Sequence, residues 1–128
     1  MRTIKFRGKC AKDSKYAGEW VEGGLLQCEK SKDVLIVYPI TDTCSCTYHV
    51  DPNTVGQFTG LQDAEGVDIY EGDLLLSFEN SEVFEVVYDA PRFCFKDNDF
   101  GFRFLNHPEN FLVCGNVYDA PKEGGKEE

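Results

Sequence analysis

The chain has 128 residues, of which 41% are hydrophobic and 28% charged, as expected for one globular domain or one with a small appended piece. Its net charge of −10 argues against non-specific nucleic-acid binding, which needs cations to displace counterions from phosphates. No apolar run approaches the ~18 residues of a membrane span, and charges interrupt the apolar residues at the N-terminus. We therefore expect a cytoplasmic protein with no membrane segment and no signal peptide.

Short segments that alternate apolar and polar residues, or that are rich in β-branched and aromatic residues, follow one another along the chain. They predict strands at residues 3–7, 19–27, 34–38, 44–50, 55–60, 74–78, 82–88, 93–95, 100–104 and 111–118. Turn signals separate them, and no segment keeps a 3.6-residue period. The sequence therefore predicts an all-β fold, a barrel or a sandwich with short helices or none, followed by a disordered tail at residues 121–128.

Glycine marks several of the expected turns. The pair Gly23-Gly24 predicts a bulge or bend that interrupts the second strand. Asp63 to Gly66 fits a type I turn closed by Gly66 in the left-handed region. Residues 71–73 predict a second turn, and residues 107–110 a loop or a single helical turn.

The charge is distributed unevenly. Residues 1–20 carry six bases against two acids, a local charge of +4, whereas residues 33–91 contain twelve acids and no Lys or Arg. The acidic body predicts a solvated, soluble surface. The basic N-terminal arm leaves one alternative open, a barrel that binds single-stranded nucleic acid.

Several carboxylates fall in the two expected turns, and they are Asp63, Glu65, Asp68, Glu71 and Asp73. Brought together, they could bind a hard cation such as Ca²⁺ or Mg²⁺. Their spacing lacks the EF-hand pattern, and turns favour Asp for local hydrogen bonds to the backbone. We therefore expect structural turn residues and neither a metal site nor a cofactor.

In a cytosolic chain the cysteines are expected to be free thiols rather than disulfides. The six are Cys10, Cys28, Cys44, Cys46, Cys94 and Cys114. Cys44 and Cys46, with His49, Cys28 and Cys10, could recruit zinc. The usual two-residue gap between ligand cysteines is absent, so the pattern favours buried strand cysteines.

Nucleophilic catalysis would need a Cys or Ser beside a His and an orienting acid. His107 sits in a turn sequence, and nothing near His49 makes Cys46 special. Gly-rich phosphate loops are absent as well. We expect no enzyme; a small hydrolase or metal-dependent enzyme is the third interpretation.

The aromatic residues exceed what one face of a small barrel needs. Candidates for an oligomer interface are Trp20, Phe93, Phe95, Phe100, Phe102 and Phe104. Interface cores are enriched in aromatic residues. An ordinary Phe core and base stacking are the alternatives that the sequence leaves open.

One long stretch and two outlying pieces carry a family resemblance. The stretch comprises Val55, Gly56, Gln57, Phe58, Thr59, Gly60 and Leu61, then Asp63 and Gly66, then Ile69, Tyr70, Glu71, Gly72, Asp73 and Leu74. The outlying pieces are residues 4–9 with 19–21, and residues 115–118. Together they resemble the YopX family, small proteins encoded in prophages and other mobile elements of bacteria.

The resemblance implies an SH3-like β-barrel at residues 51–120, an N-terminal β extension at residues 1–50 and self-association. It carries no catalytic or binding residues onto this chain. The sequence therefore predicts a non-enzymatic, self-associating module in the cytoplasm of a bacterial host. Its partners are expected to be copies of itself and a phage or host protein.

Overall fold

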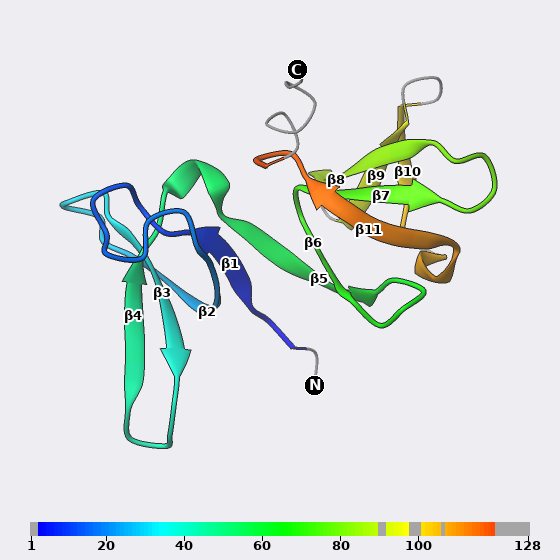
Figure 1. Ribbon diagram of the computed structural model, residues 1–128. Helices are drawn as coiled ribbons and strands as arrows, with labels where there is room; N and C mark the ends of the chain where they lie inside the picture. The colour runs from blue at the N-terminus through cyan, green and yellow to red at the C-terminus, as the bar shows by residue number, and fades with distance from the viewer. Residues whose placement is uncertain (1–2, 90–91, 98–100, 106, 120–128) are drawn as a thin grey trace. The chain divides into compact units, whose positions relative to one another are not determined.

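The computed structural model describes residues 3–89, 92–97, 101–105 and 107–119; within these, the side chains of residues 89, 92, 97 and 101–104 are not described. The described chain is built from antiparallel strands and two three-residue 3₁₀ turns, which agrees with the predicted all-β class (Figure 1). Among the described residues, no helix has the length and apolar character needed to cross a membrane. The candidate interface residue Phe100 and the expected tail at residues 121–128 lie outside the described residues.

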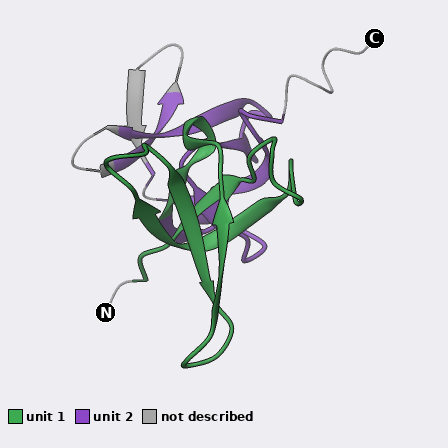
Figure 2. Cartoon of the chain, turned by 90° about the vertical axis from the view of Figure 1, so that its left-hand side faces the viewer, with its two compact units in different colours: residues 1–58 green, residues 59–128 purple. Residues whose placement is uncertain are grey.

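The chain divides into two compact units, residues 1–58 and 59–128 (Figure 2). The boundary falls inside strand β5 (Gly56–Gln62). The first residues of β5 pair with β1, and its later residues belong to the second unit.

The strands of the first unit form an antiparallel sheet in the order β4-β3-β2-β1-β5, and β6 continues that order after β5. Their bounds are β1 Phe6–Lys9, β2 Trp20–Gln27, β3 Val34–Pro39, β4 Ser45–His49 and β5 Gly56–Gln62, with the 3₁₀ turn η1 at Pro52–Thr54. Inward residues alternate with outward ones, so Val34, Ile36 and Val50 form a small buried core. Phe6, Val21, Leu25 and Val55 pack against it.

Strand β2 continues through Gly23 and Gly24, and its pairing changes there: residues 20–23 pair with β1 and residues 24–27 with β3. Gly23 also allows a close approach of two backbones. A Cβ atom at Gly23 would overlap the carbonyl oxygen of Val37 on β3. Glycine in a strand can mark a close approach of two backbones as well as a bulge.

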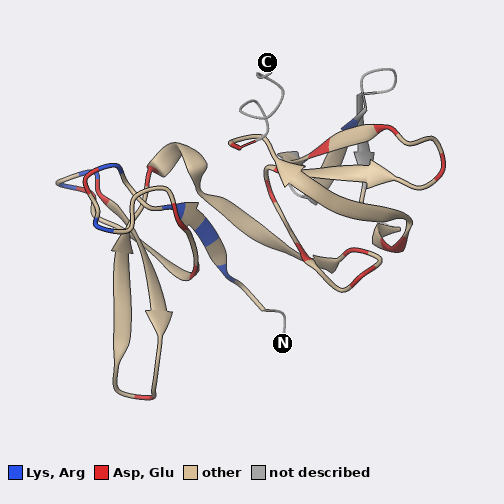
Figure 3. Cartoon of the chain, viewed as in Figure 1, with Lys and Arg blue, Asp and Glu red and all other residues tan. Residues whose placement is uncertain are grey.

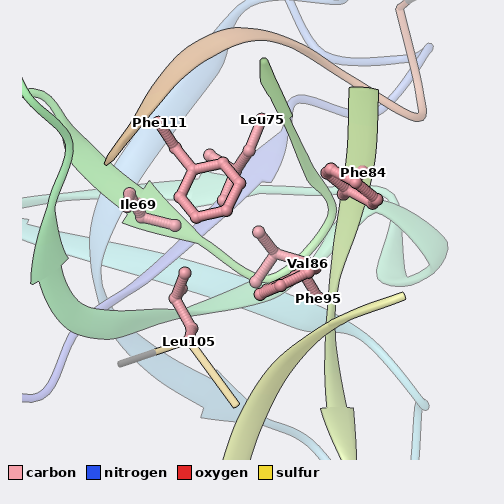
Figure 4. Close-up of a cluster of buried hydrophobic side chains, with 7 residues drawn as sticks. All are labelled: Ile69, Leu75, Phe84, Val86, Phe95, Leu105 and Phe111. Carbon is pink, nitrogen blue, oxygen red and sulfur yellow. The ribbon is translucent and has the colours of Figure 1, made fainter. Parts of the chain in front are cut away.

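The second sheet has the order β10-β9-β8-β7-β11. The bounds of the elements that follow β5 are β6 Asp68–Tyr70, β7 Asp73–Ser77, β8 Val83–Asp89, β9 Arg92–Asp97, β10 Gly101–Phe104, the 3₁₀ turn η2 Pro108–Asn110 and β11 Phe111–Asn116. The core of the second unit comprises Ile69, Leu75, Phe84, Val86, Phe95 and Phe111 on strands β6 to β9 and β11, together with Leu105, which follows β10 (Figure 4).

This second sheet is open, so the expected closure of residues 51–120 into an SH3-like barrel is not confirmed. The sheet begins at β10 and ends at β11. The edge of β11 that faces away from β7 contacts a turn instead of another strand. The carbonyl of Phe111 accepts the Ala64 N–H at 3.0 Å, and the Asp63 carboxylate accepts the Val113 N–H at 2.9 Å.

Candidate functional site

The turn between β5 and β6 is organised around Asp63. Oδ1 accepts the N–H groups of Glu65 and Val67 at 2.8 and 2.9 Å, and Oδ2 accepts that of Val113 on β11 at 2.9 Å. Gly66 closes the turn at φ 83°, as predicted. Burial alone would raise the pKa of the Asp63 carboxyl, but the N–H groups of Val113, Val67 and Glu65 outweigh it and hold the pKa below its usual value. Asp63 therefore acts as a structural anion that joins a turn to a distant strand.

The second predicted turn joins β6 to β7. Asp73 is buried, and its Oδ2 accepts the Tyr70 N–H at 2.7 Å. Gly72 adopts φ 94°, a conformation that glycine reaches without steric cost. Its carbonyl accepts the Val117 N–H at 2.9 Å, so this turn is tied to the residues that follow β11. The aspartates of both turns in the family-like stretch thus hold backbone N–H groups.

The rest of the family-like stretch also has structural contacts. The hydroxyl of Thr59 donates to the Ile69 carbonyl at 2.8 Å, and Ile69 is fully buried. Val55 packs against the core of the first unit, and Gly56 is buried on β5. Within the described part of the chain, no three His, Cys, Asp or Glu side chains gather closely enough to hold a metal ion.

Of the cysteines that could have bound zinc, Cys10 is buried and Cys46 half-buried, whereas Cys28 and Cys44 are exposed, so the expected burial is wrong for these two. Burial, followed by the negative charge of Glu19, raises the pKa of the buried Cys10 thiol. Cys46 and His49 occupy positions of opposite parity on β4 and so point to opposite faces. His49 Nε2 lies 3.7 Å from a carboxylate oxygen of Asp33, and His107 Nδ1 lies 3.3 Å from one of Glu109. Among the described residues, neither histidine is hydrogen-bonded to a thiol.

Cys28 has a different environment, in the turn between β2 and β3. The Ser31 hydroxyl, followed by the N–H groups of Ser31 and Lys30, donates toward its sulfur and lowers the pKa of the exposed thiol. Two backbone hydrogen bonds hold the turn. The Cys28 N–H donates to the Asp33 carbonyl at 2.9 Å, and the Lys32 N–H donates to the Cys28 carbonyl at 2.8 Å. The hydrogen bonds to the Cys28 sulfur make this thiol more readily ionised than that of an ordinary surface cysteine.

The candidate interface aromatics do not share one environment. Trp20 and Phe93 are half-buried, and the ring of Phe93 contacts that of Tyr88 at a centroid distance of 5.1 Å. Phe95 is a core residue, packed against Phe84 and Phe111 at 5.0 and 5.2 Å. Phe102 and Phe104 lie on β10, with side chains outside the described set.

Cations and aromatic rings meet on one face of the first unit. We call Lys5, Arg7, Lys9, Trp20 and Phe58 the basic face. Lys5 Nζ lies 4.8 Å from the Phe58 ring centre and 3.6 Å from a carboxylate oxygen of Glu22. Arg7 Cζ and Lys9 Nζ lie 4.9 and 6.0 Å from the Trp20 ring centre. These are cation–π distances. Figure 3 colours the Lys and Arg positions of β1 blue along the strand.

Strands β3 and β4, with the link at residues 40–44, form a second distinctive feature, here called the hairpin arm (Figure 1). Tyr38 and Ile40 are 50% and 58% exposed although both are large and apolar. On the neighbouring strand Leu26 is 53% exposed, but it pairs with Leu35 and therefore lies on the opposite face of the sheet from Tyr38. The link is closed by the N–H groups of Ile40 and Thr41, which donate to the Cys44 carbonyl at 2.9 and 3.1 Å.

Sequence reasoning found the basic arm but missed the aromatic partners of its cations. Trp20 was predicted to lie in an interface, and Phe58 belonged to the family-like stretch. The alternation of residues 5, 7 and 9 shows that the cations share a face. Which rings stand on that face follows from register, which pairs Lys9 with Trp20 and Arg7 with Gly56. The exposed residues of the hairpin arm had no sequence signal that separated them from a core strand.

Two comparisons with known proteins found matches, and a third found none. A family model described as YopX protein matches residues 5–123. A solved structure, the crystal structure of protein EF1440 from Enterococcus faecalis, aligns with a TM-score of 0.59 at 21% identity. The alignment covers 95% of this chain and 98% of that one, and at this identity it supports the fold. No curated protein matches the sequence.

Proposed function

The chain belongs to the YopX family, and from this premise we propose that it is a non-enzymatic module that works through protein–protein contacts, first of all with copies of itself. The setting that we propose is a phage or prophage in the cytoplasm of a bacterial host. A phage or host protein would be the further partner.

The observation that carries the proposal is the hairpin arm. Tyr38 and Ile40 extend beyond the core of the first unit, where Val34 and Ile36 on the same strand are buried. Burying apolar surface contributes roughly 25 cal/mol per Å². Large apolar side chains exposed together on a projecting hairpin are therefore suited to a protein contact.

Electrostatics favours the same region. Two copies with a net charge of −10 repel each other over most of their surface. Residues 34–50 contain one acid, Asp42, and no Lys or Arg. The hairpin arm is thus a place where two copies can meet with little charge repulsion.

Sedimentation velocity across a range of protein concentrations tests self-association. We expect the wild-type chain to form an oligomer whose population rises with concentration and with salt, because salt screens the repulsion. Replacing Tyr38 and Ile40 with Ser should weaken it. Phe78→Ser is the matched control, since Phe78 is 55% exposed but lies outside the arm. A wild-type chain that stays monomeric at the highest concentration would contradict the proposal.

The basic face supports a second candidate function, binding of single-stranded nucleic acid. Proteins of that kind combine cations that follow the backbone with aromatic rings on which bases stack. Lys5, Arg7 and Lys9 with Trp20 and Phe58 supply both groups on one sheet face. Because the rest of the chain is mainly acidic, we expect any nucleic-acid binding to be confined to the basic face.

Fluorescence anisotropy with a labelled single-stranded oligonucleotide tests this candidate. Three phosphate contacts would give a slope of log affinity against log salt of about −2. Charge reversal of Lys5, Arg7 and Lys9 to Glu should abolish binding. The matched control reverses Lys12, Lys15 and Lys30, exposed cations away from the face. Equal loss in both triple variants, or no binding at low salt, would reject the candidate.

A further inference from the structure

We propose that a second copy of the chain pairs with the outer edge of β4, antiparallel, around a two-fold axis at Cys46. This inference rests on the proposed self-association and specifies its surface. It follows from the hydrogen-bond direction along β4, from the point where its edge becomes occupied, and from the charge and side chains that the pairing would bring together.

The backbone groups of β4 alternate in direction. The Val50 N–H donates to Val34 at 3.1 Å and the Ile40 N–H to Cys44 at 2.9 Å, so the even-numbered residues between them bond toward β3. Ser45, Thr47 and His49 accordingly direct their N–H and C=O groups outward. β4 is the first strand in the sheet order, so these groups form a sheet edge.

One contact ends this edge and thereby sets the register. The Ala11 N–H donates to the His49 carbonyl at 3.0 Å, so the edge is occupied at His49. Ser45 and Thr47 remain as the outward residues within the strand. Two copies satisfy them both when Ser45 pairs with Thr47 of the partner copy and Thr47 with Ser45, which places Cys46 opposite its own counterpart.

Two of the other three edge strands, β6 and β11, carry features that discourage pairing. β6 is three residues long. The outward edge of β11 contacts the Asp63 turn, and its register shifts between Val113 and Gly115. β4, with the sequence Ser-Cys-Thr-Tyr-His, lacks the Lys, Pro and bulge that usually protect an exposed edge.

Side chains across the axis are compatible with this register. Tyr38 pairs with Cys46 and Ile36 with Tyr48 in the β3–β4 ladder, so Tyr38, Cys46 and Tyr48 share a face. Pairing at Cys46 would extend that face across the axis and cover the exposed ring of Tyr38. In a two-fold pair each charge near the axis meets its own copy, and Ser45–His49 carries no acid, Lys or Arg.

Proline at residue 47 is the first test. Thr47→Pro removes an outward N–H and leaves the bonds to β3 in place, because Thr47 does not donate to β3. Thr47→Val is the matched control, since it keeps the N–H. In sedimentation velocity we expect about tenfold weaker dimerisation, or more, for Thr47→Pro and little change for Thr47→Val. Far-UV circular dichroism should show both variants folded.

Cross-linking supplies a second test that does not depend on proline. Opposed residues between hydrogen-bonded pairs have Cα atoms about 4.5 Å apart, within the range of a disulfide. Diamide takes two electrons and two protons from the Cys46 thiols of the two copies and should give a covalent dimer. That dimer should be lost in Cys46→Ser and kept in Cys28→Ser.

The outcomes separate this inference from the function on which it rests. A monomeric wild-type chain would overturn both. A wild-type oligomer that Thr47→Pro leaves intact, with no cross-link through Cys46, would overturn the β4 edge and leave self-association through another surface.

Discussion

The Asp63 carboxylate accepts the backbone N–H of Val113 at 2.9 Å, across fifty residues of chain. Two further N–H groups, from Glu65 and Val67, share the same carboxylate. One side chain thus closes the β5–β6 turn and attaches it to β11. An aspartate in a turn usually serves its own turn alone, so the bond to Val113 gives Asp63 a second role, in the tertiary structure.

We expect Asp63→Asn to lower the free energy of unfolding by about 2–3 kcal/mol. The amide oxygen still accepts a hydrogen bond, but the NH₂ group opposes one of the three N–H donors and the charge is lost. Urea unfolding monitored by circular dichroism measures the change. Glu65→Gln, on an exposed side chain of the same turn, is the control and should remain within about 0.5 kcal/mol of wild type. Equal stability of the two variants would argue against the role given to Asp63.

Stability should also depend on pH through Asp63. Its pKa in the folded protein lies below the value of about 3.9 for an unperturbed Asp. The stabilisation is therefore complete above the unfolded pKa and is lost as pH falls through the folded pKa. The difference in unfolding free energy between wild type and Asp63→Asn should be constant from about pH 5.5 to 7.5 and shrink below about pH 4. A difference that grows on acidification would contradict this assignment.

The sequence predicted the features that depend on near neighbours. The all-β class and the left-handed Gly66 both follow from alternation and turn chemistry. The predicted closed barrel is not confirmed. Closure depends on which segment pairs with the outer edge of β11, and the Asp63 turn occupies that edge. Alternation in β9 likewise could not show that Phe95 faces the core, because its two faces are distinguished only by register with β8.

The same limit applied to the candidate sites. Cys46 and His49 are close along the chain, yet strand parity turns them apart. The aspartates of the turns were correctly predicted to bond the backbone, but the partner strand of Asp63 has no local signature. The aromatic residues of the basic face could not be predicted, because they lie beside β1 only through its pairing with two strands from different parts of the chain. Contacts set by register therefore account for most of what the sequence left undecided.

Substituting Gly72 should cost more than substituting another glycine with the same backbone conformation. Gly72 and Gly60 have φ values of 94° and 88°, so alanine at either is strained by about 1–2 kcal/mol. A Cβ at Gly72 would also lie 3.0 Å from the Tyr118 ring, whereas one at Gly60 meets nothing within 4 Å. We expect Gly72→Ala to exceed Gly60→Ala by about 1 kcal/mol in urea unfolding. A double-mutant cycle with Tyr118→Ala should remove that excess, and an excess that persists would place the strain elsewhere.

Thiol reactivity should follow the environments of the cysteines. The Ser31 hydroxyl and nearby N–H groups lower the pKa of Cys28, whereas burial raises the pKa of Cys10 and of Cys114. Because the thiolate is the nucleophile, iodoacetamide at pH 7.5 should modify Cys28 before either of the others, as followed by peptide mass spectrometry. Ser31→Ala should slow the reaction at Cys28, and Ser14→Ala, in a separate loop, should not. If Cys28 reacts no faster than Cys114, or if Ser31→Ala has no effect, the turn does not stabilise the thiolate.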